Sequence, residues 1–155
     1  MKLAISAAAL GVVLMFAAPV LAADDHMIHA PADLKWSPAP AALPKGAEVA
    51  VLFGDPSKEE LFAMRIRFPA NYQVPPHTHP KPELVTVISG TFRIGMGETA
   101  DPSKATAVPA GGFVAIAPGT AHYANSEEET VIQLNSTGPW TLNYLNPADD
   151  PRKTQ

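Results

Sequence analysis

Two segments of this sequence carry side chains whose types and spacing could bind a metal ion. The first is His77-Thr78-His79, followed by Glu83. Residues two apart on an extended chain project from the same face, so His77 and His79 point together, and Glu83 shares their parity. Prolines stand before and between these residues and pre-set the torsion φ, which reduces the entropy lost in holding the side chains together.

The face that carries Glu83 continues with Val85 and Val87, so the polar groups stand at the end of an apolar wall. Burying an unpaired charge against such a wall is costly. A divalent cation between two imidazoles and a carboxylate would remove that cost.

The second segment is an apolar run over 113–116, followed by the turn Pro118-Gly119 and then by His122. That turn can deliver His122 to the same site from a second strand. We therefore predict that one divalent metal ion is bound by His77, His79, Glu83 and His122. The alternatives are ordinary surface histidines, or a site that has lost its metal.

The elements that must position these groups are short strands. From Ala47 onward, runs rich in Val, Ile, Phe and Thr alternate with Pro, Gly, Asn and Asp at close intervals. Many short strands with regular turn signals predict an all-β antiparallel sandwich or barrel. The expected strands cover residues 48–53, 61–68, 83–89, 91–96, 112–116, 121–125, 130–134 and 140–145.

The N-terminus predicts an exported protein. Lys2 gives a positive start, an apolar run covers residues 3–20, and small residues then fit a cleavage site. We predict a signal peptide over residues 1–22, cleaved after Ala22 or Ala23, and a periplasmic location. The alternative is an uncleaved membrane anchor, since the run is almost long enough to span a bilayer. The sequence has no cysteine, which excludes a lipoprotein anchor, disulfides and thiolate chemistry.

The predicted mature chain divides into a proline-rich arm over residues 23–46, a barrel over 47–146 and a polar tail over 147–155, which we expect to be frayed. Prolines at the density of the arm disfavour helix and favour extended chain. Trp36 and Leu34 are the apolar residues that we expect to fix the arm to a barrel. Because exposed strand edges are usually covered or paired, and twofold dimers are common, we expect a homodimer.

Charge excludes one class of partner. With Lys2 removed, the chain carries 10 basic and 15 acidic residues, a net charge of −5. No basic cluster could neutralise a phosphate backbone, so we expect no nucleic-acid partner. We also expect no stable membrane association after cleavage, which leaves a small-molecule ligand or substrate.

The two segments resemble the two motifs of the cupin superfamily, GxxxxxHxHxxxxExxxxxxG, with three or four residues allowed before Glu, and GxxxxxPxGxxHxxxN. His77, His79, Glu83 and Gly90 match the first, and Gly111, Gly119 and His122 match the second. Asn71 replaces the opening Gly of the first motif, Ala117 replaces the motif Pro with Pro118 one place later, and Asn125 falls one residue early. These departures concern the shape of turns more than metal ligation.

The resemblance implies a cupin double-stranded β-helix, that is, a jelly-roll barrel. It also implies a six-coordinate ion bound by three His and one Glu, with two positions left for water, oxygen or substrate. Imidazole and carboxylate suit Fe, Mn, Ni, Cu or Zn, so the ligand set does not choose the metal.

Other residues could line the cavity of such a barrel, and no general base stands out beyond the four ligands. The alternative for each aromatic residue is an ordinary place in the barrel core, and a polar residue in an apolar run can equally face solvent. The candidates are Phe92, Met96, Phe113, Tyr123, Gln133 and Tyr144.

Small cupins resemble dioxygenases of the diketone or flavonoid type, and also isomerases. We therefore expect a metal-dependent enzyme that acts on a small organic molecule. The alternative is a non-catalytic binding or sensing module, because such chains also resemble the cupin domain of ChrR-type anti-sigma factors.

A second metal site is conceivable at the N-terminus, which also carries His29. If cleavage falls after Ala23, the mature chain begins Asp24-Asp25-His26. A free amine, two amides and an imidazole at the third position can form a square-planar Cu(II) or Ni(II) site. The alternative is an arm with incidental histidines.

Overall fold

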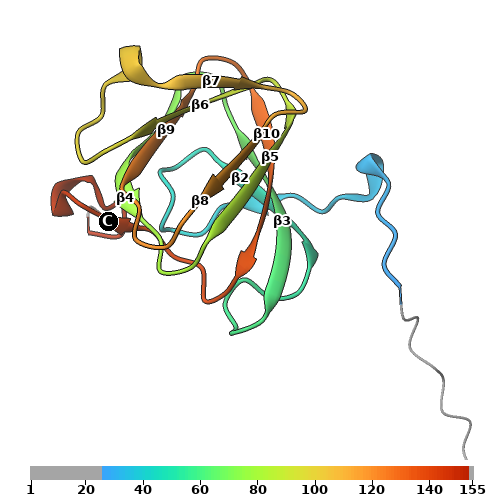
Figure 1. Ribbon diagram of the computed structural model, residues 1–155. Coiled ribbons are helices and arrows are strands. Elements are labelled where there is room, and N and C mark those ends of the chain that lie inside the picture. Colours follow the sequence, from blue (N-terminus) through green and yellow to red (C-terminus); the bar gives the residue numbers. More distant parts are fainter. Residues whose placement is uncertain (1–25, 154–155) are drawn as a thin grey trace, which may run out of the picture.

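The computed structural model describes residues 26–153, drawn in colour in Figure 1. The predicted signal peptide and the Asp24-Asp25 part of the N-terminal metal site lie outside the described residues. Within that range, the helical segments are turns of three residues, η1 (Pro31–Asp33), η2 (Pro102–Lys104) and η3 (Pro147–Asp149). None of these turns is long and apolar enough to cross a membrane.

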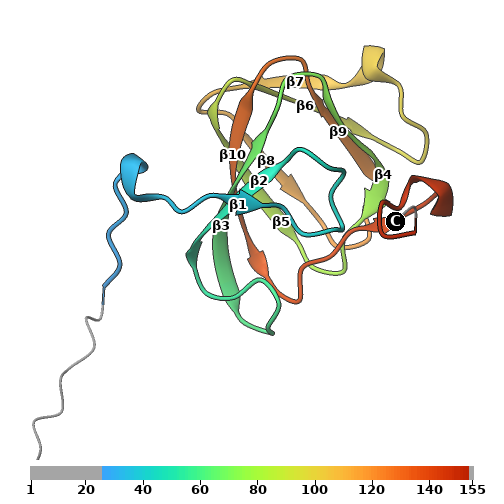
Figure 2. The same cartoon turned by 180° about the vertical axis from the view of Figure 1, so that it is seen from behind.

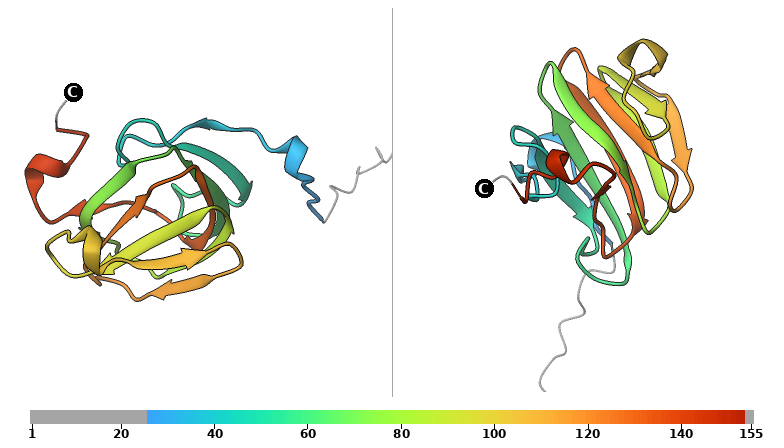
Figure 3. Two further views of the ribbon diagram at one scale, coloured as in Figure 1. Left: turned by 90° about the horizontal axis from the view of Figure 1, so that it is seen from above. Right: turned by 90° about the vertical axis from the view of Figure 1, so that its left-hand side faces the viewer.

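Residues 26–153 form eleven strands in two antiparallel sheets, which pack face to face around the core (Figures 1 and 3). The six-stranded sheet has the order β1-β2-β3-β10-β5-β8, and the five-stranded sheet has the order β11-β4-β9-β6-β7. This is the predicted all-β jelly roll. The strands are β1 (Ser37–Pro38), β2 (Glu48–Phe53), β3 (Leu61–Phe68), β4 (Tyr72–Thr78), β5 (Glu83–Ser89), β6 (Thr91–Met96), β7 (Thr106–Pro109), β8 (Phe113–Ile116), β9 (His122–Ser126), β10 (Thr130–Thr137) and β11 (Asn143–Tyr144).

Alternation along the strands puts one apolar face inside the barrel. On β3, Met64 and Ile66 are almost completely buried, and they pair with Leu134 and Ile132 of β10. The residues between them on β3 point outward and include Arg65. The inner faces of both sheets therefore form one apolar core.

A bulge in β4 turns the two motif histidines toward that core. Val74 pairs with Ala124, and the next registered pair is His77 with His122, so β4 carries one more residue than β9 over this stretch. Regular alternation from the buried Val74 would place His77 on the outer face, and the extra residue brings it inside. Pro75 and Pro76 occupy the bulge, where their lack of an N–H costs no ladder hydrogen bond.

Two turns in the first motif place a residue in the left-handed region, and one of them carries a departure from the cupin pattern. Gly90, between β5 and β6, has a φ of 72°, and a Cβ there would lie 2.5 Å from the Glu129 carbonyl oxygen. Asn71, in place of the first motif glycine, has a φ of 59°. Asn adopts this left-handed region more readily than most other residues, so the substitution preserves the turn.

The arm packs on its own barrel and then folds across one end (Figure 2). β1 pairs with β2, and the Trp36 ring lies over the Arg67 guanidinium, 4.3 Å from its central carbon. The loop over residues 39–47 brings Leu43 into the core, and the Tyr144 hydroxyl donates a 2.7 Å hydrogen bond to the Ala42 carbonyl oxygen. The arm is therefore attached by both an outer and an inner contact.

The described part of the tail, residues 147–153, is packed, so the prediction of a frayed tail was wrong for these residues. It contains η3, and the Arg152 guanidinium donates to both carboxylate oxygens of Asp150, at 2.7 and 3.0 Å. Asp150 is buried. Arg152 also donates to the Thr141 hydroxyl and to the Leu142 carbonyl oxygen, which attaches the tail to the segment after β10. The polar composition of the tail could not predict these contacts.

Candidate metal centre

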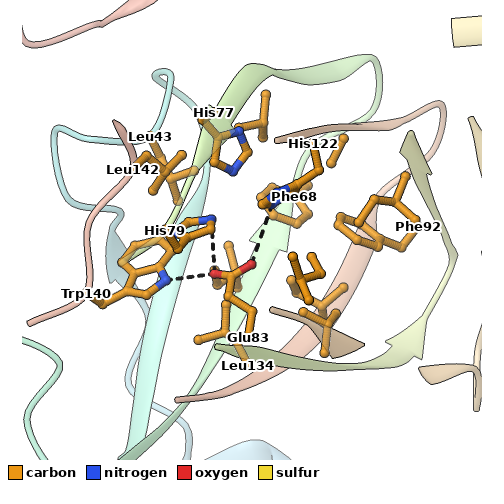
Figure 4. A pocket seen from close by; sticks show the side chains of 17 residues that line it. Leu43, Phe68, His77, His79, Glu83, Phe92, His122, Leu134, Trp140 and Leu142 are labelled. Carbon is orange, nitrogen blue, oxygen red and sulfur yellow. Dashed lines mark hydrogen bonds and ion pairs between the residues drawn. The ribbon is translucent and has the colours of Figure 1, made fainter. Parts of the chain in front are cut away.

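The four predicted ligands lie together at the ends of three strands (Figure 4). His77 lies near the end of β4 and His79 directly follows it, while Glu83 begins β5 and His122 begins β9. The Gly119 N–H donates a 2.8 Å hydrogen bond to the His79 carbonyl oxygen, which ties the turn before His122 to the first motif. All four side chains are buried.

Backbone carbonyls fix the orientation of each imidazole. The Nδ1 atoms of His77, His79 and His122 lie 2.7, 2.8 and 2.9 Å from the carbonyl oxygens of Pro75, Thr141 and Thr120. A carbonyl can only accept, so each Nδ1 carries the proton and each Nε2 keeps its lone pair. One ligand nitrogen from each ring lies within 4.8 Å of those of the other two rings.

Burial keeps these rings neutral. It lowers the pKa of His77 to about 2 and that of His79 to about 4, and nearby histidines lower both pKa values further. Burial likewise lowers the pKa of His122. Neutral imidazoles with free Nε2 lone pairs are the form that binds a metal.

Glu83 adds a buried carboxyl group to this cluster. Its Oε1 lies 3.3 Å from His79 Nε2 and its Oε2 lies 3.7 Å from His122 Nε2. Burial raises the pKa of Glu83 to about 7, although a hydrogen bond from Trp140 opposes the shift.

The four side chains together present ligand atoms that suit a cation. Ionised carboxylate oxygens and imidazole Nε2 atoms are all acceptors, and buried acceptors that face one another without a donor are unfavourable. A divalent ion would satisfy them together. The three histidines could therefore hold a metal ion, and nitrogen donors with one carboxylate suit a transition metal.

The cavity beside the cluster is small and apolar. Its volume is about 40 Å³. Apart from the four clustered residues and Trp140, the described side chains that line it are hydrocarbon: Leu43, Ile66, Phe68, Val74, Val85, Phe92, Ile94, Ile116, Ala124, Ile132, Leu134 and Leu142.

Of the residues predicted to line the cavity, Phe92 does so and the others lie elsewhere. Met96 and Phe113 are exposed, because their strand positions point outward. Tyr123 is buried, but its ring lies against Gly95 and its hydroxyl donates to the Asp101 carbonyl oxygen.

The two remaining candidates also lie outside the cavity lining. Gln133 pairs with the outward-facing Arg65 and Thr86, so it is on the outer face of the six-stranded sheet. Tyr144 is half-buried, and its ring lies 6.0 Å from that of His77. Alternation on β10 is regular, with Ile132 and Leu134 buried on either side of Gln133, so a period of two is consistent with the outward position of Gln133. Tyr144 belongs to a strand of two residues, which is too short for alternation to identify a face.

Several residues that reach the site come from segments without a recognisable motif. Trp140 contacts Glu83, the Thr141 carbonyl contacts His79, and Leu43 and Leu142 close the cavity beside His77 (Figure 4). A tryptophan directly after Gly138-Pro139 was the one available sequence signal, and it indicates packing without identifying a partner.

The N-terminal histidines do not join this centre. His26 is exposed, and His29 Nε2 lies 2.9 Å from the Leu52 carbonyl oxygen on the outside of the barrel.

Residues 24–141 match the sequence model of the ChrR cupin-like domain, so the chain belongs to that family of cupins. No curated protein matches the sequence. The family match covers strands β1 to β10 and the whole candidate metal centre.

Solved structures with the same fold include two enzymes by name. The polyketide cyclase RemF from Streptomyces resistomycificus is 16% identical with a TM-score of 0.66, over 83% of this chain and 90% of that chain. A putative acetylacetone dioxygenase from Methylibium petroleiphilum PM1 is 18% identical with a TM-score of 0.61, over 85% of this chain and 90% of that chain. An RmlC-like cupin from Shewanella frigidimarina NCIMB 400 is 17% identical with a TM-score of 0.57, over 75% and 94%. At these identities the likeness shows the fold.

Proposed function

We propose that this cupin is an exported metal-dependent enzyme, dioxygenase- or isomerase-like, that acts on a small organic molecule. One divalent Fe, Mn, Ni, Cu or Zn ion would be held by His77, His79, Glu83 and His122. The observation that carries the proposal is the convergence of three neutral imidazoles and one buried carboxyl group, with each Nδ1 committed to a backbone carbonyl.

A bound divalent metal supplies Lewis acidity and, except for Zn, redox chemistry. The chain itself orients the imidazoles, and its hydrocarbon wall excludes water and contacts the apolar part of a substrate. Among the described lining residues, no ionisable side chain stands beyond the four clustered ones. This favours a reaction centred on the metal over one that needs a separate general base.

A small diketone is the first substrate class to test. The apolar lining suits hydrocarbon, and two adjacent carbonyl oxygens suit a metal with two open positions. The name of one structure with the same fold, a putative acetylacetone dioxygenase, supports the same choice.

A non-catalytic sensing or binding module is the second candidate, and the size of the cavity favours it. A volume of about 40 Å³ holds about three water molecules. Since Leu43 and Leu142 also line that cavity, a ligand of several atoms would require the arm to move. In this alternative the metal ion itself is the ligand.

Metal analysis of protein purified from the periplasm, followed by oxygen uptake on a diketone and catechol panel, tests these candidates. We expect about one metal ion per chain, and EDTA should lower the melting temperature by roughly 5–10 °C if the metal is present at 100 times its Kd. Oxygen uptake, or conversion of a diketone, supports the enzyme. A metalloprotein that is inert on the panel favours the sensing module, and a chain that takes up none of the five metals contradicts both.

We also propose that residues 1–22 are removed on export to the periplasm. The apolar run and the small residues before Asp24 support this. The intact mass of the protein in a periplasmic fraction should correspond to a chain that begins at Ala23 or Asp24. Full-length protein in the membrane fraction would indicate an anchor.

We propose further that two copies associate through the outer face of the six-stranded sheet. Leu61 and Phe113 on this face are 69% and 60% exposed, and a groove beside Leu61 is also lined by Phe53 and Leu84. A twofold interface needs a self-complementary surface, and an exposed Phe113 on the same face as an apolar groove offers one. Light scattering should show a dimer, and Phe113→Glu should give a monomer. Met96→Glu, at an exposed position on the other sheet, should leave the dimer unchanged. A monomeric parent chain would contradict the proposal.

A further inference from the structure

Trp140 contacts two of the four clustered side chains at once. Its indole Nε1–H donates a 2.8 Å hydrogen bond to Glu83 Oε1, and its ring stacks on the His79 imidazole, with centroids 5.7 Å apart and an interplanar angle of 15°. Figure 4 shows the indole directed at the carboxylate from the side opposite His122. The hydrogen bond joins residues 57 positions apart in the sequence.

Backbone contacts hold the segment that carries this indole. The Trp140 N–H donates to the Pro56 carbonyl oxygen at 2.8 Å, and the Gly138 N–H donates to the Glu60 carbonyl oxygen at 3.0 Å. A Cβ at Gly138 would lie 2.2 Å from the Lys58 carbonyl oxygen, so the segment packs directly against that loop. The indole therefore comes from an anchored part of the chain.

The indole distinguishes the two oxygens of Glu83. Oε1 accepts the hydrogen bond from Trp140, whereas Oε2 lies 3.7 Å from His122 Nε2 and has no donor among the described residues. A carboxylate held at one oxygen by a fixed N–H cannot rotate freely, so its second oxygen keeps a constant direction. That direction is toward His122 Nε2.

We propose that Trp140 is a positioning residue that holds Glu83 Oε1 so that Oε2 faces the metal. The inference rests on the proposed function, because it concerns a metal ligand. Groups that orient ligands through hydrogen bonds commonly change metal affinity by about 10–100-fold when they are removed.

The competing explanation is that Trp140 merely fills space beside His79. Trp140→Phe separates the two roles, because phenylalanine keeps an aromatic ring against His79 but removes the N–H. Trp36→Phe is the matched control, since Trp36 stacks on Arg67 outside the barrel and the chain has only these 2 tryptophans.

The first measurement uses metal-free protein and the two indole N–H signals in a nitrogen–proton NMR spectrum, assigned with the two Trp→Phe variants. We expect the Trp140 signal to exchange slowly with water and to shift on Glu83→Gln, while the Trp36 signal stays in place. A Trp140 signal that ignores Glu83→Gln would overturn the hydrogen bond on which the inference depends.

The second measurement is a double-mutant cycle on Mn²⁺ and Co²⁺ affinity, with the parent chain, Trp140→Phe, Glu83→Gln and the double variant. We expect Trp140→Phe to weaken binding by about 10–100-fold in the parent chain and by less than about 3-fold in the Glu83→Gln background. Equal weakening in both backgrounds, or none in the parent, overturns the role of Trp140 alone. A parent chain that binds no metal overturns the proposed function and this inference with it.

Discussion

The four clustered side chains are held in two different ways. His77 and His122 each bond through Nδ1 to a carbonyl oxygen two residues earlier in the chain, within their own strand and turn. His79 and Glu83 are instead held by Thr141 and Trp140, 62 and 57 residues away. One half of the site is therefore oriented locally, and the other half depends on the packing of the segment after β10.

This difference indicates where the site can fail. The local half is retained wherever β4 and β9 form, because its hydrogen bonds are part of those elements. The remote half also requires the 138–142 segment to dock against the loop before β3, as the Trp140 and Gly138 backbone bonds show. Metal affinity should therefore be sensitive to changes near residue 140 that leave the barrel folded.

The largest effect is expected from removing a ligand, whichever half it belongs to. His77→Ala, His79→Ala and His122→Ala should each weaken metal binding by more than about 100-fold, beyond the range for a residue that only orients a ligand. Glu83→Gln keeps the side-chain volume and should disturb the fold less. Isothermal titration calorimetry with Mn²⁺ or Co²⁺ measures the metal affinity of each variant.

A control substitution in the arm tests whether the four clustered residues are the metal ligands. His26→Ala should leave the affinity unchanged, because His26 is exposed. If His26→Ala weakens binding as much as His122→Ala does, the assignment of the four ligands is contradicted.

The next effect concerns the arm, whose Leu43 lines the cavity. A chain that begins at Ala47 loses the buried Leu43 and the contact between Trp36 and Arg67. We expect the free energy of unfolding to fall by about 2–5 kcal/mol, as for deletion of a large core side chain. A chain that begins at Leu34 keeps both contacts and should stay within about 0.5 kcal/mol of the parent. Chemical denaturation of both truncations measures the difference, and equal stability would show that the arm is only a tether.

Sequence pattern was sufficient to predict the bounds of four strands. The expected strands over residues 48–53, 61–68, 83–89 and 91–96 have the same bounds as β2, β3, β5 and β6, because alternation there ends at clear turn residues. β4 was not expected, since Pro75 and Pro76 indicate a break in a strand. In the structure they occupy the bulge that turns His77 inward.

The local half of the site could likewise be predicted, because its ligands and the carbonyls that orient them lie within the two motifs. The remote half could not. No periodic pattern relates Glu83 to Trp140, and the Thr141 partner is a backbone carbonyl, which any residue would provide. Leu43 reaches the cavity because Tyr144 and Tyr72 hold its loop by hydroxyl bonds to backbone oxygens. Such contacts depend on the packed structure rather than on local sequence.

In the metal-free protein, the histidines and Glu83 have opposite effects on how stability depends on pH. The lowered pKa values of His77, His79 and His122 mean that the unfolded chain takes up protons below pH 6.5 that the folded chain does not. Their contribution to stability is therefore fully present above pH 6.5 and is lost as the pH falls. Glu83 has the opposite sign, because its raised pKa stabilises the fold below pH 4.5 and this contribution is lost as the pH rises to about 7.

The three histidines stabilise the fold as the pH rises, and Glu83 alone has the opposite effect. The free energy of unfolding should therefore rise between pH 4.5 and 6.5, by about 1.4 kcal/mol per pH unit for each proton that the unfolded chain binds in excess of the folded chain. Glu83→Gln should make the rise steeper, and His77→Gln should make it shallower. Denaturant unfolding in EDTA across this range measures the slopes. A stability that falls with pH in this window would contradict the assigned charge states.

The smallest effect is expected from the tail, which touches the remote half alone. Arg152 donates to the Leu142 carbonyl oxygen at 2.8 Å and to Thr141 Oγ1 at 3.2 Å, beside the carbonyl that orients His79. Arg152→Ala should loosen that carbonyl and weaken metal binding by about 2–5-fold, since one hydrogen bond contributes about 0.5–1.5 kcal/mol and the segment keeps its other anchors. Lys153→Ala, the next residue, removes a similar charge from an exposed side chain and should have no effect. If Arg152→Ala leaves the affinity unchanged while Trp140→Phe lowers it, then Pro56 and Glu60 anchor the remote half without help from the tail.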